Sequence, residues 1–128
     1  MKILGIGVDI IDNKRIKNLK DKNNFIRRTF GKNEINLSKK ITDKTNFFAK
    51  RFAAKESLAK SLGTGFRDNL NFKDIEIINN KFGKPYFSKS KKIDNIILKK
   101  FKIKKYDLFL SISDEKDYSI AFTILQKK

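Results

Sequence analysis

The segment from Thr45 to Leu62 limits what this chain can fold into more than any other part of the sequence. Its apolar residues recur at the spacing of one helical face, and Gly63 follows at the position where helices commonly end. These apolar residues are Phe48, Phe52, Leu58, Ala59 and Leu62. The pattern predicts one long helix over residues 45–62, around which the fold has to be built.

Shorter patterns on both sides predict further helices and strands. Strands are expected over residues 3–11, 72–79, 106–113 and 118–125, the first of them buried and ending near Asp9. Short helices are expected over residues 13–20, 25–30 and 34–40, and another after a capping Ser90. Turns are expected at residues 80–83 and 114–117, with Pro85 in an edge strand or a loop. Because the order lacks a regular strand–helix–strand alternation, we predict an α+β fold with a largely antiparallel sheet, one long helix and several short ones.

The length of the chain sets the number of domains. With 128 residues it is long enough for one compact domain and short for two, so we expect a single domain over residues 1–128. No apolar stretch approaches the roughly 18 residues that a membrane-spanning helix needs. We therefore expect a soluble, cytoplasmic protein.

Composition excludes several kinds of chemistry. The chain has no Cys and no His, which removes disulfides, thiolate or imidazole metal ligands and imidazole bases. A net charge of +17 attracts acidic proteins, nucleotides, nucleic acids or anionic lipids, and charge alone does not choose among them. Most of this excess of positive charge is explained equally well by solvated lysines on the surface.

Two carboxylates stand at structurally fixed places. Asp9 follows an apolar strand that contains two glycines, and Glu56 lies within the long helix. Carboxylates without thiolates or imidazoles suit a hard cation such as Mg²⁺, which also takes water and phosphate oxygens as ligands. Spacing alone favours a simpler reading, in which Glu56 pairs with Lys60 at i,i+4 and Asp9 pairs with an arginine.

Cationic and glycine residues near the end of the long helix suggest phosphate binding. Lys55, Lys60, Lys84 and the loop formed by Gly63, Thr64 and Gly65 could together cradle a diphosphate. A glycine helix cap with ordinary surface lysines explains the same residues, since a lone Gly-x-Gly is common. Ser111 and Ser113, at a strand end, are read from pattern alone as polar residues on an exposed face.

Several segments together carry a resemblance to a known family. They are GIGVDII at residues 5–11, RFAAKESLAKSLGTGF at 51–66, FKDIEIINNKFGKPYF at 72–87, LSIS at 110–113 and the final DYSIAFTIL. In order and spacing the chain resembles the small bacterial holo-[acyl-carrier-protein] synthases of the phosphopantetheinyl transferase superfamily, essentially over its whole length. The resemblance implies the α+β fold of that superfamily and a homotrimer with active sites between neighbouring subunits.

The resemblance also implies a reaction and residue roles. Family members transfer the 4′-phosphopantetheine arm of coenzyme A to a serine of an apo-acyl-carrier protein, with Mg²⁺, in fatty acid biosynthesis. By similarity, Asp9 and Glu56 would hold Mg²⁺ against the diphosphate and Lys60 would contact phosphate oxygens. The remaining residues implied at coenzyme A are Arg51 and the loop of Gly63, Thr64 and Gly65 at the nucleotide part, Pro85 near the adenine, and Ser113 and Asp114.

The carrier protein of this reaction is acidic, which gives the positive charge a specific meaning. A basic helix with Arg15, and Arg28 nearby, would form its docking face. We expect no membrane partner and no specific nucleic acid.

The identity of the group that removes the serine proton is left open by the sequence. Many family members have His where this chain has Asp114, so Asp114 acting through water, Glu56 and a metal-bound water are all candidates. Two other functions compete with the enzyme: a basic nucleic-acid-binding domain, and a trimeric carrier-binding module that has lost its chemistry. Which carrier protein is used, and whether acylated coenzyme A is accepted, are also open.

Overall fold

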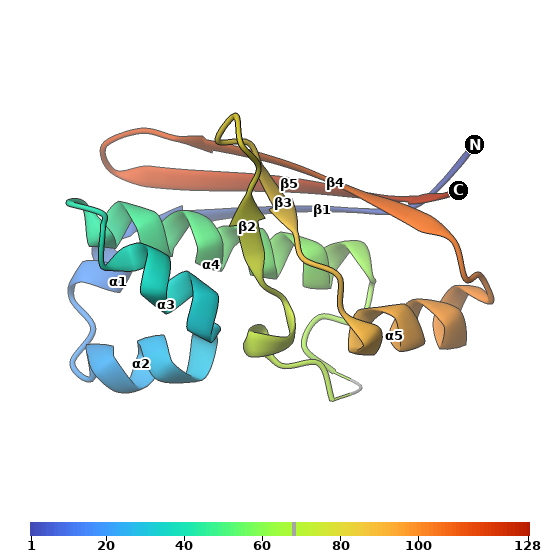
Figure 1. Cartoon of the computed structure of the whole chain (residues 1–128), viewed down its shortest axis with the longest axis horizontal. Coiled ribbons are helices and arrows are strands. Elements are labelled where there is room, and N and C mark those ends of the chain that lie inside the picture. Colours follow the sequence, from blue (N-terminus) through green and yellow to red (C-terminus); the bar gives the residue numbers. More distant parts are fainter. Residues whose placement is uncertain (68) are drawn as a thin grey trace.

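The computed structural model describes residues 1–67 and 69–128. The elements in chain order are β1 (Lys2–Asp12), α1 (Asn13–Lys17), α2 (Lys22–Thr29), α3 (Lys32–Ser38), α4 (Lys44–Ser61), a short 3-10 helix η1 (Phe72–Asp74), β2 (Ile77–Asn79), β3 (Pro85–Phe87), α5 (Lys91–Phe101), β4 (Tyr106–Asp114) and β5 (Tyr118–Lys127). Figure 1 shows the helices on one side of a sheet, with α4 beneath it, α1 to α3 near one end and α5 at the other. The predicted α+β fold is confirmed.

The strands form two antiparallel sheets. The larger has the order β1-β5-β4, and β5 in its centre pairs with β1 from Lys2 opposite Lys127 to Asp12 opposite Tyr118. The smaller sheet pairs β2 with β3 around a turn, where the backbone N–H of Gly83 donates to Asn80 over 2.9 Å. This confirms the turn at residues 80–83 and assigns Pro85 to the start of a strand.

The long helix forms as predicted. The Asp43 side chain accepts a hydrogen bond from the Asn46 backbone N–H over 3.0 Å and caps the start of α4. At the other end Gly63 adopts a left-handed φ of +77°, the conformation that commonly ends a helix.

Two glycines let β1 lie directly against α4. A Cβ added to Gly5 would stand 1.9 Å from the Ser61 carbonyl oxygen, and one added to Gly7 would stand 1.9 Å from the Ser57 carbonyl oxygen. Only a residue without a side chain fits at such a distance. The strand therefore passes close to the helix along the stretch that precedes Asp9.

The sheet is covered on one face only. Ile11, Ala121 and Leu125 face the helices and are buried in the hydrophobic core together with Leu58 of α4. On the opposite face Ile6 and Val8 of β1 remain 59% and 53% exposed. The expectation of a buried first strand is thus wrong for about half of its side chains, because no element among the described residues covers them.

Several predicted boundaries differ from the structure, among them those of α2 and α3 by two or three residues at their start. β1 continues to Asp12, so Asp9 lies within the strand rather than at its end, and α1 stops at Lys17. Residues 72–79 contain β2 only at their end, since the segment begins as η1, where the Asp74 carboxylate accepts from the Asn71 backbone N–H over 2.7 Å. Among the described residues, no helix combines the length and the apolar character that crossing a membrane requires.

Candidate active site

Asp9, Glu56 and Lys60 come together where β1 packs on α4. Lys60 Nζ lies 3.3 Å from Asp9 Oδ1 and donates to the Val8 carbonyl oxygen over 2.9 Å. Within the described part of the chain Glu56 forms no ion pair, so the i,i+4 pairing that spacing favoured is not the one that forms. We call Asp9, Glu56 and Lys60 the carboxylate half-site.

The environment of this half-site disfavours charge on its carboxylates. Burial raises the pKa of Asp9, and the hydrogen bond and charge of Lys60 offset part of that effect. Burial also raises the pKa of Glu56, and the neighbouring charge of Asp9 raises it further. A cation bound beside both groups would relieve this repulsion.

Arg15 contributes positive charge to the same place. Its charge lowers the pKa of Asp9 and that of Glu56, against the larger effect of burial. The short helix α1 is held in place through Asn13, whose Oδ1 accepts from Ser119 Oγ over 2.8 Å and whose backbone N–H donates to the Asp117 carbonyl oxygen over 2.7 Å. Arg15 thus lies near the carboxylates, and Arg28 is exposed on α2.

A small cavity of about 140 Å³ lies apart from the carboxylate half-site and is lined by Arg51, Pro85 and Asp114. We call these three residues the arginine half-site; Lys50, Asn79, Gly83 and Ile112 complete the lining. Arg51 is nearly buried, with its guanidinium carbon 3.9 Å from the centre of the Phe47 ring, and its Nε has no hydrogen-bond partner among the described residues. That Nε lies 4.0 Å from Glu34 Oε2 in an ion pair, and Arg51 Nη2 donates to Asn79 Oδ1 over 3.4 Å. A polar ligand in the cavity could supply the hydrogen bond that Nε lacks.

Asp114 has a partner in the place where many relatives carry histidine. Its Oδ2 accepts a hydrogen bond from Asn46 Nδ2 over 2.7 Å, which ties the end of β4 to the first turn of α4. Ser113, next to it, lies on the uncovered face of the sheet and does not join Asp114 in this cavity.

The two half-sites lie at opposite edges of the sheet. Asp9 is on β1 and Asp114 ends β4, with β5 between these strands. Neighbouring strands are about 4.8 Å apart, so the edges are separated by roughly 10 Å. One chain therefore holds the two groups of predicted residues apart.

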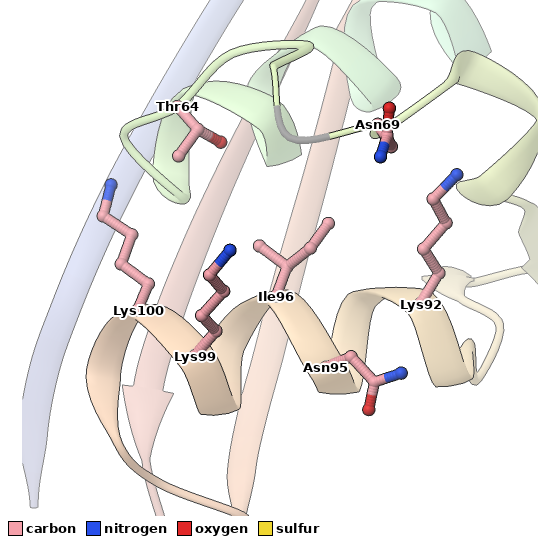
Figure 2. A pocket seen from close by; sticks show the side chains of 7 residues that line it. All are labelled: Thr64, Asn69, Lys92, Asn95, Ile96, Lys99 and Lys100. Carbon is pink, nitrogen blue, oxygen red and sulfur yellow. The ribbon is translucent and has the colours of Figure 1, made fainter.

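The glycine loop follows the carboxylate half-site along the chain. Gly63 and Gly65 have φ values of +77° and +61°, and the Gly65 backbone N–H donates to the Ala59 carbonyl oxygen over 3.2 Å. Thr64, between these two glycines, lines another cavity, whose other wall is formed by residues of α5 (Figure 2).

Lys55 does not face any ligand, which corrects the expectation that it cradles a diphosphate. Its side chain is fully buried and its Nζ lies 2.7 Å from Glu34 Oε1, in an ion pair whose two members are both inaccessible. The same amine donates to the carbonyl oxygens of Phe72 and Ile75. Glu34 in turn accepts from the Gly31 and Ile77 backbone N–H groups. Lys55 thus joins α4 to α3 and to the segment before β2.

A row of partly exposed phenylalanines beside the carboxylate half-site was not predicted. Ring centres are 5.6 Å apart for Phe25 and Phe52, 5.4 Å for Phe52 and Phe72, and 3.8 Å for Phe72 and Phe66. Phe52 precedes Glu56 by one helical turn, so the phenylalanine row passes close to this carboxylate. The helical spacing placed Phe52 on the apolar face of the helix, and Phe52 does pack against the core while staying partly exposed. Phe66 and Phe72, near the glycine loop in the sequence, were the signal that the apolar residues continue to the surface.

Comparison with known proteins agrees with these features. Residues 5–123 match the model of the 4′-phosphopantetheinyl transferase superfamily. The chain is 62% identical to the holo-[acyl-carrier-protein] synthase of Pelagibacter ubique, over all of both sequences. Among solved structures it resembles the holo-[acyl-carrier-protein] synthase of Neisseria meningitidis (TM-score 0.86, 37% identity, covering 98% of this chain and 100% of that one).

A second solved structure is similar over the same extent. The enzyme of Bacillus anthracis, described in complex with CoA (3′,5′-ADP), has a TM-score of 0.80 and 36% identity, covering 98% of each chain. The fold, the length and the sequence thus lead to one assignment. The chain belongs to the 4′-phosphopantetheinyl transferase superfamily and, within it, to the holo-[acyl-carrier-protein] synthases.

Proposed function

We propose that this protein transfers the 4′-phosphopantetheine group of coenzyme A to a serine of an apo-acyl-carrier protein, giving the holo protein and adenosine 3′,5′-bisphosphate. The observation that carries the proposal is the meeting of Asp9, Glu56 and Lys60 on the seam between β1 and α4, in a chain of this family. The proposed reaction belongs to fatty acid biosynthesis and consumes coenzyme A, so we assign the protein to the cytoplasm and the whole of residues 1–128 to one catalytic domain.

Mg²⁺ is the cation that fits the carboxylate half-site. Asp9 and Glu56 offer two oxygen ligands, and the chain has no thiolate or imidazole to select a softer metal. No cluster of three or more acidic residues occurs in the described part of the chain, so water and substrate phosphate would complete the coordination, as is usual for Mg²⁺. When bound, the ion would neutralise charge on the diphosphate.

The residues of the chain supply the remaining steps. The carrier serine oxygen bonds to the β-phosphorus while the bond from that phosphorus to the bridging oxygen breaks, and the bridging oxygen leaves with the adenosine bisphosphate. Lys60, fixed by Asp9 and the Val8 carbonyl oxygen, stabilises the negative charge on the leaving group. Glu56 and Asp114 are the carboxylates of this chain that remain candidates for accepting the serine proton.

A second copy of the chain completes the site in this proposal. The arginine half-site, where the Nε of Arg51 lacks a hydrogen bond among the described residues, is the better place for the nucleotide, but it lies across the sheet from the carboxylates. A neighbouring subunit would bring its arginine half-site against the carboxylate half-site of the first. The uncovered apolar face of the sheet supports such assembly, and the resemblance to the family indicates three copies.

The carrier protein would dock beside the carboxylate half-site. Arg15 and Arg28 offer positive charge to an acidic partner, and the phenylalanine row offers an apolar strip for one of its helices. Charge would hasten the encounter, and the aromatic rings would hold the complex.

Intact-mass analysis of an apo carrier protein tests the function. Incubation with this protein, Mg²⁺ and coenzyme A should add one phosphopantetheine, and Asp9→Asn or Glu56→Gln should abolish or strongly slow the addition. No mass gain with several acidic carrier proteins would leave a carrier-binding module as the better account. Steeply salt-dependent RNA binding that ignores coenzyme A would instead favour the nucleic-acid-binding alternative.

A further inference from the structure

The cavity between α5 and the segment after α4 shares Thr64, but no other lining residue, with the residues expected at coenzyme A. Its volume is about 550 Å³ and its lining consists of Thr64, Asn69, Lys92, Asn95, Ile96, Lys99 and Lys100. This is a size typical of sites for small molecules. The cavity therefore has room for a ligand of its own.

The arrangement along α5 gives the cavity two polar ends and an apolar middle. Lys92, Ile96, Lys99 and Lys100 recur at the spacing of one helical face. Figure 2 shows Lys99 and Lys100 pointing toward Thr64 at one end, Lys92 pointing toward Asn69 at the other, and Ile96 between them. The lysine stems add further apolar surface below their amines.

The charge is concentrated at the end formed by Lys99 and Lys100. Lys92 is compensated by Asp74, whose Oδ2 lies 2.9 Å from its amine. Lys100 donates to the Leu62 carbonyl oxygen, a contact that leaves its positive charge and two of its N–H groups available. Neither Lys99 nor Lys100 forms an ion pair within residues 1–67 and 69–128. Two positive charges therefore face one end of the cavity.

We propose that this cavity binds a small organic phosphate monoester. Its phosphate dianion lies between Lys99 and Lys100, and its apolar part covers Ile96 toward Asn69. The Thr64 hydroxyl, which donates to the Gly65 carbonyl oxygen over 3.1 Å, would turn from that oxygen to donate to the phosphate. Two ammonium groups match the charge and the several oxygens of a phosphate. The ligand contacts the loop of residues 63–65 without touching Asp9 or Glu56, so the site is separate from the carboxylate half-site.

Nuclear magnetic resonance titration of the full chain with n-butyl phosphate tests this site. We expect saturable shifts of the Ile96 methyl and Asn69 side-chain amide signals, weaker binding of inorganic phosphate, and no binding of n-butanol. Lys99→Gln should weaken the binding of butyl phosphate by about fivefold or more, which is the loss of affinity expected for one partly exposed charged hydrogen bond. Lys91→Gln is the matched control, because it removes the same charge from α5 outside the cavity, and should change affinity less than about twofold.

Three results would overturn the proposal. Unchanged Ile96 and Asn69 signals would mean that the cavity is empty, and equal effects of Lys99→Gln and Lys91→Gln would mean that only overall charge matters. Displacement of butyl phosphate by coenzyme A at one-to-one stoichiometry would assign the ligand to the substrate site instead. All readouts are binding measurements, so they do not depend on whether phosphopantetheine transfer is observed.

Discussion

Gly7 of β1 lies so close to Ser57 of α4 that a methyl group on the glycine would stand 1.9 Å from the serine carbonyl oxygen. This contact sets the separation of strand and helix two residues before Asp9. The same separation fixes the distance from Asp9 to Lys60, which are joined at 3.3 Å. Stability and site geometry therefore both depend on this glycine.

Gly7→Ala should destabilise the fold by about 3 kcal/mol, because the added methyl group has to push helix backbone away from the strand. The measurement is urea unfolding followed by circular dichroism. Gly83→Ala is the control: its φ of +83° is unfavourable for alanine, but nothing lies within 4 Å of the new methyl group. We expect it to cost about 1 kcal/mol. Equal losses in both variants would contradict the packing argument.

Glu56→Gln should raise the melting temperature of the metal-free protein at pH 7 by on the order of a few degrees. The folded-state pKa of Glu56 is raised, so ionisation of this group opposes folding once the pH exceeds its ordinary value of 4.5. The advantage of the variant should shrink as the pH falls through the raised pKa and vanish below 4.5, where both states are protonated. Melting curves at several pH values check this, with the exposed Glu115→Gln as control. A lower melting temperature for Glu56→Gln at pH 7 would mean that the carboxylate stabilises the fold.

Lys55→Met should destabilise the protein by about 3–5 kcal/mol, because it removes the ammonium group 2.7 Å from the buried Glu34 carboxylate and leaves Arg51 Nε, 4.0 Å away, as the remaining cation. The double variant Lys55→Met/Glu34→Gln should lose less stability than Lys55→Met alone, since the negative charge of Glu34 is gone as well. Chemical unfolding of the wild type, the two single variants and the double variant gives a double-mutant cycle. Additive losses would show that the two side chains do not stabilise each other.

Ile120→Glu should break the proposed assembly. Ile120 is 39% exposed on the uncovered face of the sheet, and Leu98 has the same exposure on α5. A carboxylate on the sheet face should shift the protein from trimer to monomer in light scattering after size-exclusion chromatography, whereas Leu98→Glu should leave the assembly intact. A wild-type monomer at micromolar concentration would overturn the proposal of a shared active site.

Arg28→Glu should raise the KM for the carrier protein by about fivefold at low salt and leave the KM for coenzyme A nearly unchanged. The difference should decline with added salt, because the interaction is between exposed charges. Arg27→Glu is the neighbouring control on α2, because it makes the same change of charge at an exposed position that faces another direction on the helix. A similar effect of both substitutions would point to overall charge rather than a docking face.

The sequence predicted the elements whose patterns are local. The helix over residues 45–62 and the strand pair near the end of the chain depend on periodicity and capping, and both formed. Exposure of Ile6 and Val8 could not be predicted, because a run of apolar residues does not say whether a second layer covers it. Asp9 was expected at a strand end since the pattern carries no information on where pairing with β5 stops.

The candidate site shows the same limit. The glycines before Asp9 marked an unusual strand, yet the close approach to Ser57 is a relation between segments far apart in the sequence. Lys55 and Lys60 look alike in sequence; the first is buried against Glu34 and the second reaches Asp9, because they lie on different sides of one helix. The division into two half-sites follows from the strand order, which periodicity does not give.

The position of β5 also governs when the molecule can fold. It is the last strand in the chain but the middle strand of its sheet, with Lys127 opposite Lys2. During synthesis β1 and β4 leave the ribosome without a partner, and the apolar face of α4 stays open until residues 118–127 arrive. Contacts between such distant segments slow folding, and exposed apolar surface on the waiting chain favours aggregation. A nascent chain that stalls before Tyr118 therefore lacks the larger sheet, and its uncovered apolar residues are free to associate with other chains.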